Sequence, residues 1–408
     1  MEDRVLIQAA ASYGTPFYLF DLDEFYRKVR ETGQALGERV SLCYAMKANP
    51  FLVPFLPEGL GKIEACSYGE YRICRASGIS PERVIVSGVL KREEEMGKIF
   101  GEKGELPVFT VESISQFQML RAMADREKRK VSLLLRLTSR NQFGMSVGQL
   151  EEMAVGCRAE PWVHFLGIHY FSGTQKRNVQ QVVHELLYLD ELCRALEQSL
   201  GYGMEHLEYG PGLPVDYFQG EKDRSREFLK EIRDCVDSMK FQGKIMFEMG
   251  RFLTASCGYY VTEIQELKRN GGQSCAMVDG GIHHLYYDGQ LMAMKRPYVR
   301  KLPEGMQGAY EEWEICGALC TVNDILARKQ PLVAATPGDL LVFERAGAYS
   351  MTEGMSVFLS RELPAVAVWG TERGLLKVRG HVDTYCLNLP VIRENYGRIK
   401  EHFSGDLA

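Results

Sequence analysis

The sequence predicts an α/β fold, a TIM-like (β/α)8 barrel followed by a C-terminal β-domain. Three observations lead to this prediction. Up to about residue 257, short apolar runs alternate with helical patterns. After that point, strand-like runs follow one another with no comparable helices between them. The length of 408 residues suits one large domain and a second, smaller one.

The first part of the chain contains a series of short apolar strands, several of them followed by a helical segment. Repeated strand–helix units with buried strands imply a parallel sheet, and this many units within about 240 residues suit a closed barrel. The predicted strands are Val40–Tyr44, Val84–Ser87, Val108–Val111, Val131–Arg136, Phe165–Tyr170, His206–Tyr209 and Lys244–Glu248, and the predicted helices are Glu70–Ala76, Ile114–Arg126 and Val179–Leu200.

In the second part of the chain the strand-like runs have no comparable helices between them, and we expect it to be a β-domain over residues 258–408. The barrel then spans residues 25–257, and we expect the N-terminal segment 1–24 to join the β-domain. We expect Phe17–Phe20 to pair with the β-domain and the charged stretch Lys301–Gly308 to form an exposed loop. The predicted strands are Tyr259–Lys268, Ser274–Asp279, Glu312–Cys316, Asp339–Phe343, Ala365–Trp369 and Leu376–Val378.

The composition argues against several classes of protein. A formal net charge of −5 does not fit a nucleic-acid interface, which needs a basic face. No run approaches the roughly 20 apolar residues of a membrane span, and the acidic N-terminus does not resemble a signal peptide. The eleven cysteines are scattered, which indicates free thiols in a reducing cytoplasm. Cys316 and Cys320 come nearest to a metal-ligand spacing, but no paired cluster completes a site, so we expect no metal centre.

Two reactive side chains lie near predicted strand ends. Lys47, in Tyr44–Pro50, directly follows an apolar strand, and in a barrel such a position points into the site. A lysine placed there can form a Schiff base with a cofactor, although a solvent-exposed lysine is the plain alternative. His169, in Ile168–Thr174, can stack on a flat cofactor or can be a hydrogen-bonded core histidine.

Two further motifs follow predicted strands. The turn Gly210-Pro211-Gly212 can present backbone N–H groups to a phosphate, although Pro211 supplies none and glycines more often simply make a turn. Glu248-Met249-Gly250-Arg251 offers a carboxylate for a protonated ring nitrogen and an arginine beside it, or a surface ion pair. All four motifs fall at the carboxyl ends of strands, where barrel enzymes build their sites.

In their order along nearly the whole chain, these and other motifs resemble the fold-type III pyridoxal-phosphate (PLP) decarboxylases. This family includes the diaminopimelate and ornithine decarboxylases and has an alanine-racemase-like fold. The matching segments are Tyr44–Asn49, Glu64–Glu70, Ser87–Gly88, Val111–Ser113, Gln142–Met145, His169–Thr174, Gly210–Gly212, Glu248–Arg251, Val278–Gly281, Arg296–Pro297, Cys320 and Ala346–Tyr349.

The resemblance implies a role for each matching position. Lys47 would carry PLP as a Schiff base, His169 would stack on the pyridine ring, and Glu248 would pair with the ring nitrogen and keep it protonated. Arg296 would contact an amino-acid substrate. Cys320 would reach the site from the partner subunit of a head-to-tail homodimer and supply a proton after carbon dioxide leaves. The phosphate would be surrounded by Ser172, Gly210, Gly212, Arg251 and Tyr349.

The chain departs from the family pattern at three places. Pro211 and Met249 stand where glycine and proline are usual, and neither removes a charged group. Thr321 follows Cys320, where decarboxylases of free diamino acids usually have an acidic residue that holds the distal amine. This Cys-Thr pattern is similar to decarboxylases of conjugated amino acids, such as the glutamyl-acyl-carrier-protein decarboxylase of butirosin biosynthesis. Asp324 can partly replace the missing carboxylate, which keeps free diaminopimelate and ornithine open as substrates.

Two other function classes compete with a decarboxylase. A non-catalytic homologue would act as a binding protein, and the presence of Lys47, His169, Glu248 and Cys320 argues against it. An amino-acid racemase on the related barrel usually has arginine, not glutamate, facing the ring nitrogen, so Glu248 argues against that class too. The sequence therefore favours a PLP-dependent decarboxylase, with the identity of its amino acid left open.

Overall fold

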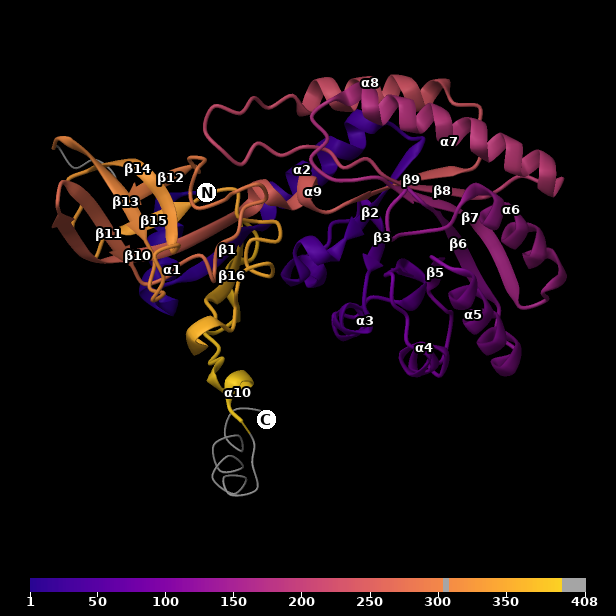
Figure 1. The fold of residues 1–408 in the computed structure, drawn as a ribbon, viewed down its shortest axis with the longest axis horizontal. Helices are drawn as coiled ribbons and strands as arrows, with labels where there is room; N and C mark the ends of the chain where they lie inside the picture. Colours follow the sequence, from indigo (N-terminus) through magenta and orange to yellow (C-terminus); the bar gives the residue numbers. More distant parts are fainter. Residues whose placement is uncertain (304–307, 391–408) are drawn as a thin grey trace.

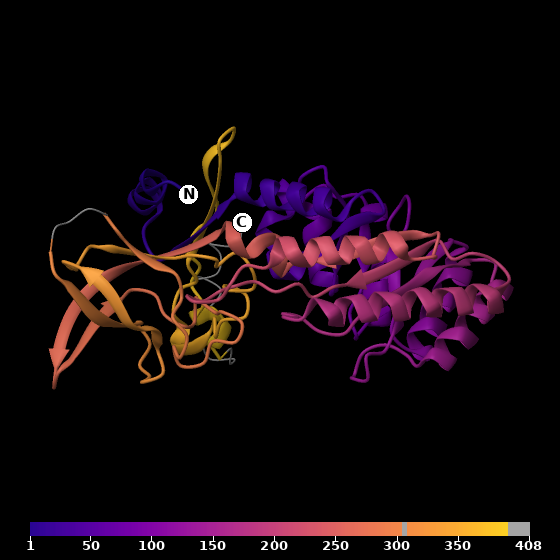
Figure 2. The ribbon, with the colours of Figure 1, turned by 90° about the horizontal axis from the view of Figure 1, so that it is seen from above.

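The computed structural model describes residues 1–303 and 308–390 and contains two bodies side by side (Figure 1). One is a closed barrel of eight strands and the other is a separate, mainly antiparallel sheet. The view from above shows the same division, with α7 and α8 lying along the barrel (Figure 2). The predicted fold class, a (β/α)8 barrel plus a β-domain, is confirmed.

The barrel strands are short and almost wholly apolar, as strands that are covered on both faces must be. Neighbours pair in parallel from β2 round to β9, which closes on β2. The strands are β2 (Val40–Ala45), β3 (Leu60–Ala65), β4 (Val84–Val86), β5 (Val108–Val111), β6 (Val131–Leu137), β7 (Val163–Phe171), β8 (His206–Gly210) and β9 (Lys244–Met249).

Helices surround the barrel, and several begin at a polar cap just after a strand end. Ser67 caps α3 and Ser113 caps α5 through side-chain bonds to backbone N–H groups, and Ser146 forms a full capping box with Gln149. The helices of the described residues are α1 (Asp3–Tyr13), α2 (Leu22–Leu36), α3 (Tyr68–Ala76), α4 (Glu93–Phe100), α5 (Ile114–Glu127), α6 (Val147–Gly156), α7 (Val179–Leu200), α8 (Ser225–Ser238), α9 (Arg251–Thr254) and α10 (Tyr385–Asn388).

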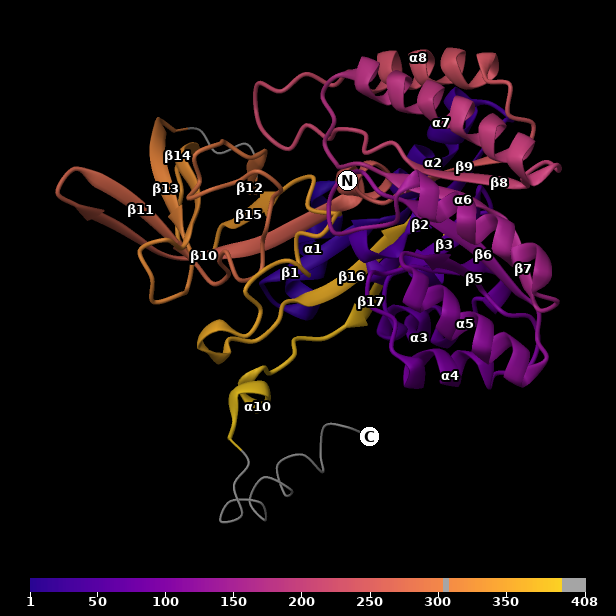
Figure 3. The same cartoon turned by 45° about the vertical axis from the view of Figure 1, so that its right-hand side comes forward.

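The second sheet has the order β14-β13-β11-β10-β1-β16-β17, with β15 pairing to β10 and β12 pairing to β15. Its N-terminal strand β1 lies between β10 and β16, so the start and end of the described chain meet in this sheet (Figure 3). Its strands are β1 (Phe17–Asp21), β10 (Gly258–Asn270), β11 (Gln273–Val278), β12 (Val299–Leu302), β13 (Tyr310–Cys316), β14 (Ile325–Val333), β15 (Leu340–Phe343), β16 (Ala365–Gly370) and β17 (Gly374–Arg379).

A small apolar cluster fills the inside of the barrel. Its members come from strands on all sides of the ring, so they can meet only in the interior. This plug leaves room for a site only at an end of the barrel. The members are Cys43, Ile85, Val108, Leu134, Leu166 and Met246.

Most predicted strands are present within one or two residues at each end, and Phe17–Phe20 joins the second sheet as expected. The predicted loop Lys301–Gly308 is wrong at its start, because Lys301 and Leu302 belong to β12 and pair with β15; residues 304–307 lie outside the described part. The division at residue 257 stays a prediction, and its C-terminal limit, residue 408, lies outside the described residues. Among the helices that the structure describes, none is long and apolar enough to cross a membrane.

Candidate active site

A cavity of about 300 Å³ opens at the carboxyl end of the barrel strands. Its lining comes from the turns after β2, β7, β8 and β9 and from one loop of the second sheet. Lys47, Glu248, Gly212, Arg251 and Tyr349 all line it. These five residues come from four segments that are far apart in the sequence and meet in one cavity.

Lys47 lies in a short 3-10 turn directly after β2 and reaches two carboxylates. Its Nζ donates to Glu64 Oε2 at 2.7 Å and to Glu248 Oε1 at 3.0 Å, and it lies 3.5 Å from Cys66 Sγ. The side chain of Lys47 is 37% exposed, whereas those of Glu64 and Glu248 are 3% and 7% exposed. The ammonium group is thus held at the cavity wall by two buried acids.

The two carboxylates respond differently to this setting. Burial, and next repulsion from Glu248, raise the pKa of Glu64. Burial also pushes the pKa of Glu248 upward, but the charge of Lys47 and hydrogen bonds from Glu64 and Lys47 outweigh it, so the pKa of Glu248 falls below its usual range. Of the pair, Glu248 is therefore the carboxylate that stays ionised and Glu64 the one that takes a proton first.

His169 contacts the second oxygen of Glu248. The ring Nε2 lies 3.2 Å from Glu248 Oε2, and the ring Nδ1 is buried with no hydrogen-bond partner. Burial, and next the charge of Arg136, lower the pKa of His169 to about 3. The imidazole is therefore neutral at physiological pH and offers a flat, uncharged ring at the side of the site.

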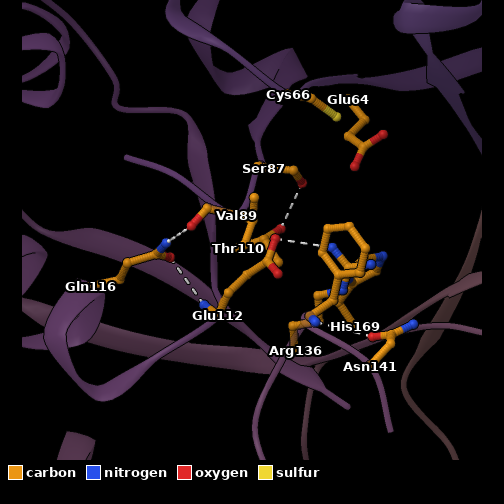
Figure 4. Close-up of polar contacts among 12 residues, drawn as sticks. Glu64, Cys66, Ser87, Val89, Thr110, Glu112, Gln116, Arg136, Asn141 and His169 are labelled. Carbon is orange, nitrogen blue, oxygen red and sulfur yellow. Dashed lines mark hydrogen bonds and ion pairs between the residues drawn. The ribbon is translucent and has the colours of Figure 1, made fainter. Parts of the chain in front are cut away.

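A polar network lies beside His169 on the neighbouring strands (Figure 4). Arg136 on β6 forms a buried ion pair with Glu112, which follows β5, at 2.9 Å. Gln116 on α5 accepts from the backbone N–H of Glu112 and donates to the carbonyl of Val89. These bonds tie three strand-end turns together and fix the charged groups that face the imidazole.

The opposite side of the cavity is suited to an anion. Arg251 donates from Nη1 to the Tyr217 hydroxyl at 3.0 Å, and its guanidinium lies 4.6 Å from the ring centre of Tyr349. The Nε of Arg251 is buried without a hydrogen-bond partner. Gly212 has φ +61°, and a Cβ there would overlap the carbonyl oxygen of Gly173, so only glycine lets this turn pack against the turn after β7 at the cavity.

Gly210 ends β8, and a Cβ there would overlap the ring of Phe171, which lines the cavity. Ser172 follows the same strand as Phe171, but its hydroxyl donates to Glu185 on α7 at 2.7 Å. The structure therefore packs Gly210 against Phe171 and not directly in the cavity lining, and it directs the side chain of Ser172 to a helix.

The residues predicted to contact substrate lie elsewhere. Cys320 and Arg296 are exposed, and within the described chain no hydrogen bond or ion pair links either one to Lys47. Thr321 accepts from the backbone N–H of Asn323 at 3.4 Å. Asp324 is buried and accepts from the backbone N–H groups of Ile282 and Leu319 at 2.8 and 2.7 Å. These two bonds hold the loop that contains Asp324 and Cys320 in place.

Glu64 and Cys66 are site residues that the sequence reasoning missed. Both belong to a segment that matched the family pattern, but the strand Leu60–Ala65 that carries them was not predicted. Gly61 and Lys62 interrupt its apolar run, which hid the signal. A complete set of eight strands would have placed Glu64 beside Lys47, because its strand β3 pairs with β2.

A family model described as "Pyridoxal-dependent decarboxylase, pyridoxal binding domain" matches residues 22–255. That is more than half of the chain. The protein belongs to the PLP-dependent decarboxylases. Family membership confirms the predicted enzyme class, a PLP-dependent amino-acid decarboxylase, and its cofactor.

Relatives within and around this family act on different amino acids. L-glutamyl-[BtrI acyl-carrier protein] decarboxylase of Niallia circulans is 27% identical and covers 86% of this chain and 88% of its own. Diaminopimelate decarboxylase of Zymomonas mobilis is 28% identical over 94% of both chains. The solved diaminopimelate decarboxylase of M. jannaschii, in complex with L-lysine, shares the fold with a TM-score of 0.83, 21% identity and 95% coverage of both chains.

The cavity fits the cofactor that this family uses. A phosphate needs a cation and free donors, and Arg251 presents a buried Nε without a partner beside the close-approach turn at Gly212. An aldehyde needs an amine, and Lys47 supplies one at the cavity wall. A pyridine nitrogen needs an anion to stay protonated, and Glu248 is a buried carboxylate with a lowered pKa. The residues present match each chemical part of PLP.

Proposed function

We propose that Lys47 binds the PLP aldehyde, Glu248 pairs with the ring nitrogen and His169 packs on the ring face. Arg251, Tyr349, Gly210 and Gly212 would hold the phosphate, with Ser172 as a further donor if it leaves Glu185. When bound, PLP supplies an electron sink for the pair released as the bond from the α-carbon to the carboxyl carbon breaks. The observation that supports this proposal is the cluster of Lys47 between Glu64 and Glu248.

In this proposal the two glutamates have separate tasks. Glu248 remains ionised, because Lys47 and Glu64 hold its pKa low, so it can keep a bound ring nitrogen protonated. Glu64 has a raised pKa and lies 2.7 Å from the Lys47 amine. It can therefore accept and return a proton at Nζ as the lysine binds or releases a ligand.

The test of the cofactor site uses two lysines. Lys91 also lies at this end of the barrel, is buried, and has its pKa lowered to about 8 by burial, so it is the rival amine. Borohydride reduction followed by peptide mapping should place the cofactor on Lys47 alone. The variant Lys47→Ala should lose the trapped adduct, and Lys91→Ala should keep it. An adduct on Lys91 in the wild-type protein would reject the assignment.

We further propose a homodimer in which Cys320 completes the site of the partner subunit. A single chain leaves Cys320 exposed and away from the cavity lining. Exposed apolar side chains belong to the Cys320 loop and to a segment bound to that loop. Val322 is 89% exposed, and the exposed Phe358 and Leu359 lie in a segment held to the Cys320 loop by the bond from Arg361 to the Ala318 carbonyl. A second copy would cover these apolar groups and place the thiol where it can protonate the α-carbon after carbon dioxide leaves.

The substrate that we propose is an amino acid whose side chain ends in a neutral or conjugated group, with a carrier-protein thioester as one form. A distal ammonium brought out of water needs a carboxylate, or it bears a desolvation cost. Thr321 offers no charge. Asp324, the nearest acid in the sequence, is buried and already accepts two backbone N–H groups. The relative from Niallia circulans, which acts on a carrier-linked glutamate, supports the same proposal.

A free diamino-acid decarboxylase is the second candidate, supported by the diaminopimelate decarboxylases among the relatives. Arg296 would then contact the substrate, and Asp324 would have to leave its loop bonds. The deciding measurement is kcat/KM for free diaminopimelate, ornithine and lysine against a carrier-linked and an amidated glutamate. We expect the conjugated substrates to be preferred at least tenfold. A clear preference for any free diamino acid would reject the proposed substrate and leave the enzyme class unaffected.

We also propose the cytoplasm as the location. The structure joins none of the eleven cysteines in a disulfide bond. Free thiols in this number are typical of proteins kept in a reducing compartment. Detection of the protein in a cell fraction free of membranes would test the proposal.

A further inference from the structure

Two thiols and a carboxylate meet on one face of the second sheet. Cys275 on β11 is opposite Glu314 on the neighbouring parallel strand β13. Cys316 follows two residues later on β13, so its side chain returns to the same face. The two Sγ atoms and a carboxylate oxygen all lie within 4.8 Å of one another. None of the three residues lines the lysine cavity.

We propose that Cys275, Glu314 and Cys316 bind a divalent metal ion of the zinc class. Zinc takes thiolate sulfur at about 2.3 Å and carboxylate oxygen at about 2.0–2.2 Å in a tetrahedron, which sets its ligand atoms about 3.5–3.8 Å apart. The three ligand atoms here lie within 4.8 Å of one another, and rotation of the side chains would close the remaining distance. Thiolates select zinc over magnesium or calcium, and water would fill the fourth position.

The carboxylate is already oriented by neighbouring residues. Arg328 on β14 and Gln273 on β11 both donate to Glu314, to different oxygens. Bonds of this kind from outside the ligand set fix how a carboxylate faces its metal. The two thiolates and Glu314 would carry three negative charges, which the dication and Arg328 together balance. The site therefore holds the right charge for a divalent ion.

A cysteine binds zinc as a thiolate, so each thiol must lose its proton when the metal enters. Metal binding should therefore release protons and strengthen as the pH rises.

The position of the site suggests what the metal would do. Strand β13 ends at Cys316, and the next residues form the loop that carries Cys320 and Thr321. The backbone N–H of Gly317 donates to the carbonyl of Asp324 at 2.9 Å and closes this loop. A metal that joins Cys316 to Cys275 would therefore anchor the base of the Cys320 loop to the sheet.

In the sequence, Cys316 and Cys320 come nearest to a metal-ligand spacing, and no metal centre is expected there. In the fold Cys320 is exposed, and the group of potential ligands found in the described chain does not include it. The true neighbour of Cys316 comes from a strand about forty residues earlier. Pairing of two strands creates this site, and no spacing along the chain reveals it.

The test is a cobalt titration of the full-length protein after removal of metal with a chelator under a non-thiol reductant. We expect one equivalent of Co²⁺ to bind and to give thiolate charge-transfer absorption with visible bands of tetrahedral intensity, at longer wavelength than PLP absorbs. Zn²⁺ should abolish these bands by displacement. The Tm of the metal-free protein should rise on addition of Zn²⁺.

Matched variants locate the site. Cys275→Ser and Cys316→Ser should each weaken Co²⁺ binding at least tenfold, and Cys386→Ser and Cys320→Ser should bind as the wild type does. Circular dichroism would show that each variant folds. Wild-type protein that binds no Co²⁺, or binding that survives in Cys275→Ser and Cys316→Ser, would overturn the proposal. So would binding lost in Cys320→Ser, which would assign the metal to the sequence-local pair.

Discussion

Glu248 accepts from Lys47 through one carboxylate oxygen and faces His169 with the other. We predict that Glu248→Gln keeps cofactor binding but loses about a thousandfold in kcat, about 4 kcal/mol of barrier. A neutral amide cannot hold a ring nitrogen protonated. Glu205→Gln is the control. Glu205 is an exposed residue just before β8, at the amino end of the barrel strands and so away from the cavity at their carboxyl end. Absorbance titration and steady-state rates provide the measurement, and near-wild-type turnover would show that Glu248 does not serve the ring.

His283 is a second buried imidazole, and neither ring nitrogen has a hydrogen-bond partner. Burial, and next the neighbouring His284 and Arg361, lower its pKa to about 3. In the unfolded chain the His283 imidazole is protonated below about pH 6.5, whereas in the folded chain it stays neutral down to about pH 3. Stability should therefore fall as the pH drops through 6.5, by up to about 1.4 kcal/mol per pH unit from this residue.

Replacing the imidazole with a ring that cannot titrate should remove this dependence. The Tm of His283→Phe minus that of the wild type should increase as the pH falls from 7.5 to about 5. His184→Phe, at an exposed position on α7, should track the wild type across the same range. Parallel Tm curves for His283→Phe and the wild type would contradict the assignment of a neutral His283.

At the scale of elements, the turn after β8 closes against the turn after β7. Gly212 has φ +61° and a Cβ there would overlap the Gly173 carbonyl. We predict that Gly212→Ala lowers PLP affinity at least tenfold, because the two turns must move apart at the phosphate side. Gly220→Ala is the matched control in the same loop, with φ +86° and open space around a Cβ. It bears only the left-handed backbone cost of about 1–2 kcal/mol.

Equilibrium dialysis of both variants would measure the affinities. Equal losses in Gly212→Ala and Gly220→Ala would assign the effect to backbone strain and remove the steric argument. A loss confined to Gly212→Ala would support close approach of the turn to a ligand.

Whether a helix or strand could be predicted from the sequence depends on how regular its pattern of apolar residues is. Strands such as β5 and helix α7 have unbroken apolar patterns and were predicted to the residue. The strand β3 was missed because Gly61 and Lys62 break its pattern, and with it went Glu64. The strand β14 was missed because the polar residues Arg328, Lys329 and Gln330 and then Pro331 interrupt its apolar pattern. In each case a neighbour distant in sequence decides the structure.

The site shows the same limit. Lys47, Glu248 and Arg251 could be predicted because each lies at or just after the carboxyl end of a barrel strand, where the strand ends converge. The hydrogen bonds of the Asp324 carboxylate could not be predicted. Their donors, the backbone N–H groups of Ile282 and Leu319, come near Asp324 only when the Cys320 loop folds against the turn after β11. A motif shows that a charged residue is present. The backbone donors around that residue decide whether its charge can still bind a substrate.

At the scale of the whole molecule, Lys47 and Cys320 lie in different bodies of one chain, the barrel and the second sheet. If two subunits share their sites, each complete site takes Lys47 from one chain and Cys320 from the other. We predict that Lys47→Ala and Cys320→Ala homodimers are each nearly inactive, because every site lacks one of the two groups. After subunit exchange, half of the dimers are mixed, and each mixed dimer holds one site with both native residues.

Mixing equal amounts should therefore restore about a quarter of wild-type activity. Exchange itself should be followed independently, by labelling each variant with a different fluorophore and measuring energy transfer. The control is a mixture of Lys47→Ala with the double variant Lys47→Ala/Cys320→Ala, which exchanges but can form no complete site. Full exchange without recovered activity would mean that Lys47 and Cys320 do not act together across an interface. If each site took both residues from one chain, one site of a mixed dimer would lack Lys47 and the other would lack Cys320, so neither would be active.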